Sequence, residues 1–430
     1  MMIKRFILYD KNITRDSYIW NLFASIIQAF QSVIMLILIT HLSGLEDAGI
    51  FTIAYANANL FLNVGKYGMR YYQVSDVRGD FSFAEYRRSR VITTAAMIGT
   101  SCIYIVYAAF MNAYSTEKSL IMLCQCLLMS VSAIEDVYHG LYQNKGRLDV
   151  AAKAAFLRTI LALTCFIISF AVCRNLLYAS AAATALSFAL YIVFTKWTYP
   201  LFEEKNAVFS KEKVCVLLRQ CFPLFCGAFL SIYIGNVPKY AIDAQLSDEV
   251  QACYGFIAMP VFVVGLLNNF IFMPSLRKLS VLWNEGNIND FIVSVLKYVG
   301  FIAGVTIVCI LGAHLVGIPV LSFLYNTPLE PYKTDLLILL VGGGFLGLAG
   351  FLNAIITVVR FQNSIIWGYA TAAVISSILA DGAVIRWGIR GASVLYVMIM
   401  ACVSLLFSIF LLYGALIRPK RNKFGDANSR

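Results

Sequence analysis

Three polar residues near the middle of the chain are spaced to bind an anion within a membrane. Asn236, Lys239 and Asp243 follow an uncharged apolar run, Phe222 to Gly235, and their i, i+3, i+7 spacing places them on one helical face. A lysine at hydrocarbon depth costs ~2.5–3.5 kcal/mol, so it normally faces protein or water. Either Lys239 snorkels at a helix end and pairs with Asp243, or it lines a cavity as a cation for an anionic passenger.

Other apolar segments carry polar stripes, in which successive residues lie three, four or seven positions apart and so share one helical face. The stripes are Asn21, Ser25, Gln28 and Ser32; Tyr55, Asn59, Asn63, Lys66 and Arg70; Gln125, Ser132, Asp136, His139 and Gln143; Asn353, Thr357 and Arg360; and Ser377 with Asp381. One stripe alone is explained by hydrogen bonds that hold membrane helices together. Several stripes, with charges among them, indicate the lining of a water-filled cavity.

The charged members of these segments divide by sign. The candidate cavity cations are Lys66, Arg70, Lys239 and Arg360. Lys66 and Arg70 lie near the end of the second apolar segment, where snorkelling to the membrane surface is the alternative. The candidate ion-coupling carboxylates are Asp136, Asp243 and Asp381. Glu135 cannot share the face of Asp136, so one of the two must contact another helix or the interface.

Composition predicts a membrane protein that crosses the bilayer many times. Of 430 residues, 60% are hydrophobic and only 13% are charged, whereas soluble domains are about one quarter charged. The net charge of +11 resides in short loops between apolar segments, so it indicates topology and implies no nucleic-acid partner. Eleven cysteines show no disulfide or zinc spacing, and the sequence implies neither a metal nor a cofactor.

Hydropathy predicts twelve spans in an all-α fold. They lie near 17–40, 47–69, 91–112, 119–142, 156–173, 176–195, 220–242, 251–274, 296–318, 334–358, 364–385 and 392–417. Alternate connections hold 26 lysines and arginines on one side against six on the other. The positive-inside rule therefore places both termini in the cytoplasm.

The chain is expected to form two pseudo-symmetric six-helix lobes around a central cavity. The longest cytoplasmic loop, 196–219, divides the spans into six plus six, which gives a lobe at 1–213, a lobe at 214–417 and a basic tail at 418–430. A shift of 204 residues aligns Leu42, Ser43 and Ala48 with Leu246, Ser247 and Ala252. Matching topology makes a parallel repeat the better interpretation.

Enzyme motifs are missing from the sequence. There is no Walker A loop, no His-Glu-x-x-His, no Gly-x-Ser-x-Gly and no Cys-x-x-Cys. The pair Glu46-Asp47 invites comparison with lipid-dependent glycosyltransferases, but its loop is short and is best explained as a turn between helices. A transporter is the expected class.

Several segments resemble bacterial polysaccharide-biosynthesis flippases, the polysaccharide-transport branch of the multidrug/oligosaccharidyl-lipid/polysaccharide exporter superfamily. The similar segments are NLFASIIQAF, KYGMRYYQVSD, EDVYHGLYQNKGRLDVAAKAAFLR, NVPKYAID and MPVFVVGLLNNFIFMPSLRKLSVLWNEGN. The resemblance implies alternating-access flipping of undecaprenyl-diphosphate-linked oligosaccharide units across the bacterial cytoplasmic membrane, for O-antigen, capsule or similar polysaccharide. It also implies as partners the polyprenyl-diphosphate-linked oligosaccharide itself, membrane lipid, a polysaccharide polymerase and glycosyltransferases.

A diphosphate that crosses a bilayer needs fixed cations, because lysine and arginine pair strongly with phosphate oxygens. The resemblance therefore assigns the diphosphate to Lys66, Arg70, Lys239 and Arg360. It assigns sugar hydroxyls to cavity amides, which are Asn21, Gln28, Asn59, Asn63 and Asn236. Two alternatives stay open: an ion-coupled drug or metabolite antiporter of the same superfamily, and an integral-membrane sugar polymerase or glycosyltransferase.

Overall fold

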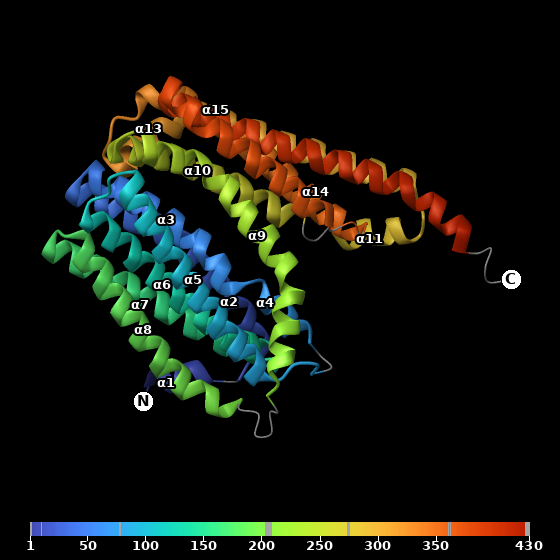
Figure 1. The fold of residues 1–430 in the computed structure, drawn as a ribbon, viewed down its shortest axis with the longest axis horizontal. Coiled ribbons are helices and arrows are strands. Elements are labelled where there is room, and N and C mark those ends of the chain that lie inside the picture. Colours follow the sequence, from blue (N-terminus) through green and yellow to red (C-terminus); the bar gives the residue numbers. More distant parts are fainter. Residues whose placement is uncertain are drawn as a thin grey trace. The chain divides into compact units, whose positions relative to one another are not determined.

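Helices make up the fold in the computed structural model, which describes residues 2–9, 11–76, 79–202, 209–272, 276–359, 361 and 363–425. No strand occurs among these residues. The chain divides into two compact units, Met1–Ile232 (unit 1) and Tyr233–Arg430 (unit 2). Figure 1 shows the helices of each unit as a bundle.

Unit 1 begins with a short helix, α1, and then contains six long ones. The helices are α1 Met2–Leu8, α2 Ile13–Ser43, α3 Leu45–Lys66, α4 Met69–Ser75, α5 Phe83–Met111, α6 Thr116–Asn144, α7 Leu148–Cys173 and α8 Leu176–Thr198, and a 3₁₀ turn follows at Tyr199–Leu201. Helix α9, Lys211–Gln245, leads into unit 2.

Unit 2 continues with shorter helices between its long ones. They are α10 Asp248–Phe272, α11 Leu276–Asn284, α12 Ile288–Gly312, a π-helical turn at Ala313–Gly317, α13 Ile318–Tyr325, a 3₁₀ turn at Glu330–Tyr332, α14 Lys333–Val358 and α15 Asn363–Gly425. Gly388 interrupts α15 with non-helical dihedral angles (φ 55°, ψ −134°), so α15 is two helices.

The predicted all-α polytopic membrane fold is confirmed. Nine helical stretches of the described residues have the length and hydropathy of a membrane span, with α15 counted once. Helices α3 and α10, with 22 and 25 residues, also have the length of a span. With α15 taken as two helices, a helix of the described residues lies at each of the twelve predicted spans.

One helix lies at the centre of each unit. Helix α6 packs against α3, α5, α7 and α8, and 67% of its span is buried. Helix α14 packs against α10, α12 and α15, and 56% of its span is buried. Both are the fourth predicted span of their half, which is the arrangement that a duplicated six-helix unit would have.

The boundary between the units falls inside α9, whereas the sequence places a lobe boundary after residue 213. The first half of α9 belongs to unit 1 because Leu217 and Cys221 are fully buried in its core. Farther along the same helix, the ring of Phe225 stacks on Tyr67 with centroids 4.7 Å apart.

Helix starts in unit 1 follow local capping signals. Ser82 and Glu85 form a complete capping box at the start of α5. Ser115 accepts a hydrogen bond from the Lys118 amide at the start of α6, and Asn175 accepts one from the Tyr178 amide at the start of α8. The α5 cap places the helix start eight residues before the predicted span.

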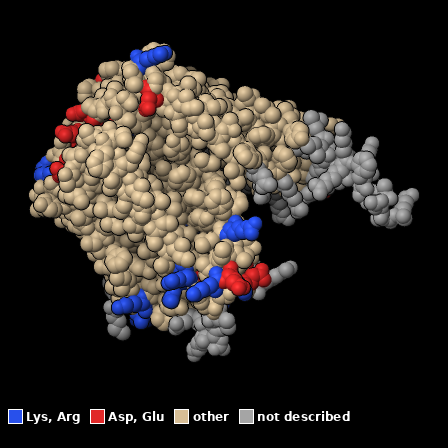
Figure 2. All heavy atoms as spheres, viewed as in Figure 1, with Lys and Arg blue, Asp and Glu red and all other residues tan. Residues whose placement is uncertain are grey.

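Most of the surface in Figure 2 carries no charged side chain, as expected for helices that face lipid. Lysine and arginine side chains gather at one end of the unit 1 bundle, the lower end in this view, where α1 lies in Figure 1. This end of unit 1 is therefore the one that fits the predicted cytoplasmic face.

Candidate functional site

A break in the helical path separates the two predicted cations of unit 1. Helix α3 ends at Lys66, and Tyr67 and Gly68 both adopt left-handed dihedral angles (φ 52° and 64°) before α4 begins. The stripe from Tyr55 to Arg70 is therefore not one continuous helical face. A Cβ at Gly68 would lie 2.8 Å from the Leu224 Cβ, so both the backbone angle and the packing require glycine there.

Helix α4 is held against α6 by a close contact. A Cβ on Gly140 of α6 would lie 2.1 Å from the Gln73 side-chain oxygen, so only a glycine leaves room for Gln73. The Gln73 amide then donates to the Val137 carbonyl at 2.9 Å. This contact turns the start of α4, and with it Arg70, toward the polar face of α6.

Arg70 is oriented by two residues of α6. Its Nε and Nη2 both donate to Gln143 Oε1, at 3.2 and 2.9 Å, and its Nη1 donates to Asp136 Oδ1 at 3.1 Å. The side chain keeps 32% exposure. A guanidinium has five N–H donors, so two of them remain for another acceptor.

Arg90 of α5 lies behind Asp136 and is fully buried, with 1% of its side chain exposed. Its Nη2 lies 2.8 Å from Asp136 Oδ2, and its Nη1 donates to the Gly65 carbonyl near the end of α3. Thr93 donates to the same carbonyl at 2.8 Å. Arg90 thus fastens α5 both to α6 and to the end of α3.

The charges around Asp136 do not balance. Arg70 and Arg90 each bind one of its oxygens, and Lys66 also acts on it electrostatically. Among the described residues, Lys66 makes no hydrogen bond or ion pair. We call Lys66, Arg70, Arg90 and Asp136 the Asp136 cluster. Three cations share one carboxylate, so the cluster carries a net positive charge that attracts an anion.

The predicted polar residues of α2 and α3 differ in how far they are buried. On α3, Asn59 and Asn63 are partly buried, and each donates one N–H to the carbonyl four residues before it. An amide group has a second N–H and an oxygen. Those of Asn63 remain for another partner, whereas Asn59 also interacts with the Tyr55 hydroxyl. On α2, Asn21 and Gln28 are exposed, and Ser25 between them is exposed as well.

Two further basic residues, Arg158 and Lys153, form buried ion pairs within unit 1. Arg158 of α7 forms a two-pronged pair with Glu135, at 2.7 and 2.6 Å, and also donates to Ser132 and Ser187. Glu135 therefore contacts another helix, as its position beside Asp136 predicts. Lys153 lies 2.9 Å from an Asp16 oxygen and donates to the Tyr9 carbonyl.

Arg90, Lys153 and Arg158 are among the 26 lysines and arginines that the sequence places on the cytoplasmic side, and their burial was not predicted. Helix α5 begins at Phe83, and α7 begins at Leu148. Arg90 therefore lies two turns inside its helix. The Ser82-x-x-Glu85 capping box is the sequence signal that marks this earlier start.

The predicted residues of unit 2 lie on α9 and α15. Helix α9 continues past Pro238 to Gln245, so Lys239 is inside a helix and not at its end. Asn236 and Lys239 are partly buried and Asp243 is buried. No hydrogen bond or ion pair to another described residue engages the Lys239 ammonium.

Of the other two predicted positions of unit 2, Asp381 and Arg360, the structure describes only Asp381. Asp381 is exposed, one turn beyond Ser377, whose hydroxyl lies 2.9 Å from the Tyr233 hydroxyl of α9. Arg360 lies outside the described residues. In the part of the chain that is described, no three His, Cys, Asp or Glu side chains gather as a metal site would require.

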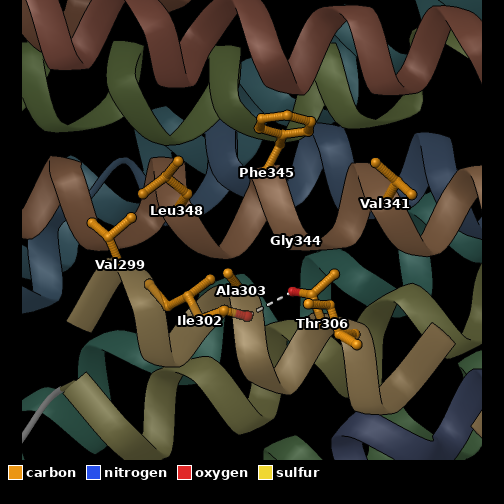
Figure 3. Close-up of a pocket in the computed structure, with 9 residues that line it drawn as sticks. Val299, Ile302, Ala303, Thr306, Val341, Gly344, Phe345 and Leu348 are labelled. Carbon is orange, nitrogen blue, oxygen red and sulfur yellow. Dashed lines mark hydrogen bonds between the residues drawn. The ribbon is translucent and has the colours of Figure 1, made fainter. Parts of the chain in front are cut away.

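An apolar groove of about 230 Å³ lies between α12 and α14. Figure 3 shows its lining, in which the Thr306 hydroxyl is turned to the Ile302 carbonyl of its own helix at 2.8 Å. A Cβ at Gly344 would meet Thr306 at 2.7 Å, so the two helices touch closely at that point. The groove offers no charged group, and it is not a site for a phosphate.

No protein-family model matches the sequence, and no curated protein matches it. Solved structures do match. An inward-facing multidrug resistance MATE family transporter of the MOP superfamily is 14% identical, with a TM-score of 0.67 over 92% of this chain and 96% of that one. The chain has the fold of these transporters.

Two other solved structures share the fold. The lipid II flippase MurJ, in an inward closed conformation, is 13% identical, with a TM-score of 0.69 over 92% of this chain and 87% of that one. A MOP superfamily transporter from Pyrococcus furiosus is 14% identical, with a TM-score of 0.58 over 97% of this chain and 98% of that one. The chain is thus similar in fold both to a multidrug transporter and to a lipid flippase.

Proposed function

We propose that this protein is a flippase for an anionic, lipid-linked substrate. The substrate is a polyprenyl-diphosphate-linked oligosaccharide, which the protein moves across the bacterial cytoplasmic membrane with both of its termini in the cytoplasm. The Asp136 cluster carries this proposal, because three cations around one carboxylate attract an anion and repel a cationic drug. The lipid II flippase among the structures of the same fold supports a lipid-linked passenger.

Arg70 is the proposed first contact for the diphosphate. It is the one arginine of the Asp136 cluster with substantial exposure, and two of its N–H donors are unused. Guanidinium donors pair with phosphate oxygens in short charge-assisted hydrogen bonds. Lys66, four residues earlier and partly buried, supplies a second positive charge without a competing hydrogen bond among the described residues.

Arg90, Asp136 and Gln143 are the proposed positioning residues. Asp136 and Gln143 fix three of the Arg70 donors, so less rotamer entropy is lost when the remaining two meet a phosphate. Arg90 neutralises the other oxygen of Asp136 from the buried side. Without it, Asp136 would compensate more of the Arg70 charge and weaken its attraction for a substrate.

The amide groups of α2 and α3 are proposed for the oligosaccharide. Asn63 retains one N–H and one oxygen, Asn59 presents its amide group beside the Tyr55 hydroxyl, and Asn21 and Gln28 are exposed. Such groups both donate to and accept from sugar hydroxyls. On a membrane helix, exposed amides are stable only beside water or polar partners, which agrees with a hydrated path for the sugar.

For ion coupling, the proposed carboxylates differ in their surroundings. Both oxygens of Asp136 are bonded to arginines, so a proton or a sodium ion must compete there with two guanidinium groups. Asp243 is buried on α9 and Asp381 is exposed on α15. These two remain candidates, and Lys239 and Arg360 remain proposed diphosphate contacts of unit 2.

The test is transport in proteoliposomes by variants of Arg70. Arg70→Gln removes the proposed phosphate contact, while Asp136 keeps Arg90 as its partner, so unit 1 should stay folded. A lost charged hydrogen bond is worth ~1.5–3 kcal/mol, so substrate affinity should fall roughly ten- to a hundred-fold. Arg88→Gln, an exposed arginine of α5, is the matched control with the same change of charge.

Two outcomes would overturn the proposal. Transport of the diphosphate-linked substrate by Arg70→Gln at the rate of Arg88→Gln would mean that Arg70 makes no substrate contact. The other such outcome is a wild-type protein that exports a cationic drug and leaves the diphosphate-linked substrate in place. That second result would favour the multidrug transporter class, whose fold the chain shares.

A further inference from the structure

The short N-terminal helix α1 is fastened to unit 1 on one side. Ile7 is fully buried in the core at this end of the bundle. Lys153 donates to the Tyr9 carbonyl at 3.1 Å, directly after α1. The ring of Phe6 meets Trp20 of α2 edge to face, with centroids 5.1 Å apart. A seven-residue helix is not stable alone, so these contacts hold it in place.

The exposed residues of α1 combine apolar and basic groups. Ile3 and Phe6 are 42% and 37% exposed, and Lys4 and Arg5 between them are exposed too. Neither Lys4 nor Arg5 bonds to any other residue that the structure describes. Exposed apolar side chains beside unpaired cations are unfavourable in water alone but fit the boundary between lipid headgroups and acyl chains.

The same mixture continues into the start of α2. Lys11 and Arg15 are exposed, and Tyr18 is 76% exposed. Among the first sixteen residues the basic ones are Lys4, Arg5, Lys11 and Arg15, against the acidic residues Asp10 and Asp16. Asp16 is buried and lies 2.9 Å from the Lys153 Nζ, and the Nε of the exposed Arg15 lies 3.8 Å from it. Tyrosine and tryptophan concentrate at membrane interfaces, and Trp20 lies next to Tyr18 on this segment.

The length of α2 places this segment at the membrane surface. Its 31 residues span about 46 Å at ~1.5 Å per residue, whereas the hydrocarbon core is about 30 Å thick. The first turns of α2 therefore extend beyond the hydrocarbon, and α1 is joined to them by four residues. This length is compatible with Lys4 and Arg5 at the level of the lipid phosphates.

We propose that α1 and the first turn of α2 form a binding surface for anionic phospholipid headgroups, with Ile3 and Phe6 inserted among the upper acyl carbons. Lys4, Arg5, Lys11 and Arg15 supply the positive charge that an anionic headgroup complements. The surface is separate from the Asp136 cluster, and the inference does not depend on the proposed transport function. Its ligand is a phospholipid of the surrounding bilayer.

The test compares hydrogen exchange of the full chain in two kinds of nanodisc. One contains phosphatidylcholine alone, and the other contains phosphatidylcholine mixed with phosphatidylglycerol. Each basic side chain near an anionic surface favours binding on the order of five-fold. The two basic residues of α1, Lys4 and Arg5, should therefore slow exchange at residues 2–9 by up to about 25-fold with phosphatidylglycerol. The effect should fade at high salt, because a Debye length of ~3 Å at 1 M screens the charges. Nanodiscs expose both leaflets equally, so the result is independent of orientation in the cell.

Two double variants separate the proposed surface from charge in general. Lys4→Gln with Arg5→Gln should remove the effect of phosphatidylglycerol at residues 2–9. Arg87→Gln with Arg88→Gln makes the same change of charge at exposed positions of α5 and should leave the effect in place. Equal exchange in the two lipids for the wild-type protein would overturn the proposal, and so would equal loss of protection in both double variants.

Discussion

Replacement of Asp136 by asparagine should destabilise unit 1 strongly, because it leaves Arg90 without a counter-ion. Arg90 is 1% exposed, and its one other acceptor among the described residues is the Gly65 carbonyl. Arg70 also loses its carboxylate partner, but it is 32% exposed and keeps Gln143. The free-energy penalty therefore arises mainly at Arg90.

The magnitude follows from the burial of that pair. Removal of one partner of a buried ion pair costs ~3–5 kcal/mol, since the remaining charge is uncompensated. For a unit of 232 residues, Met1–Ile232, each kcal/mol shifts the melting temperature by ~2–4 °C. Asp136→Asn should accordingly lower the melting temperature by roughly 6–20 °C.

The assay is thermal unfolding of the purified protein in detergent, at one scan rate, with two comparison variants. Arg90→Met combined with Asp136→Asn removes the buried charge as well, so it should melt above Asp136→Asn alone. Asp335→Asn is the matched control: Asp335 is equally buried, but its partner Arg390 is 49% exposed and can turn to water. That variant should lose less than Asp136→Asn.

The reasoning would be refuted by either of two results. Asp136→Asn could melt with the wild type, which would mean that Arg90 finds another partner or water. Otherwise the double variant could melt no higher than Asp136→Asn, which would show that the penalty does not come from an uncompensated Arg90 charge.

Three further changes have defined outcomes. Gly68→Ala should cost ~2–4 kcal/mol of unfolding free energy, because it combines the backbone strain of φ 64° with a contact of 2.8 Å to Leu224. Gly79→Ala is its control: Gly79 has φ 70° but lies in open space, so this variant should cost only the ~1–2 kcal/mol of backbone strain. Glu135→Gln should lower the melting temperature like Asp136→Asn, because Arg158 is 5% exposed. Lys239→Gln should leave the melting temperature unchanged or higher but reduce translocation of the substrate, whereas Lys239→Arg should retain translocation. Normal transport by Lys239→Gln would exclude a role for this lysine in substrate binding.

The spans were predictable from the sequence because hydropathy depends only on local composition. A helix of the described residues lies at each of the twelve predicted segments, and the ends differ mainly where a cap or polar residues extend a helix, as at Phe83 and Lys211. Such extensions escape a hydropathy window, because a turn rich in arginine or lysine resembles a loop even when it is helical.

The contacts of the Asp136 cluster were only partly predictable. The stripes placed Arg70, Asp136 and Gln143 on inward faces, but the bonds between them join residues 66 and 73 positions apart. Arg90 escaped prediction for the same reason: its burial is offset by a carboxylate 46 positions away. The left-handed turn at Tyr67 and Gly68 was hidden too, since a glycine near a helix end is compatible with several turns.

The central claim is that the passenger is an anion carried through its phosphates. Its most direct test is leaflet-resolved translocation in proteoliposomes of two substrates with the same prenyl chain and the same oligosaccharide. One has a diphosphate link, and the other has a neutral link. The wild-type protein should move the diphosphate-linked substrate and leave the neutral one in its original leaflet, and equal movement of both would contradict the claim.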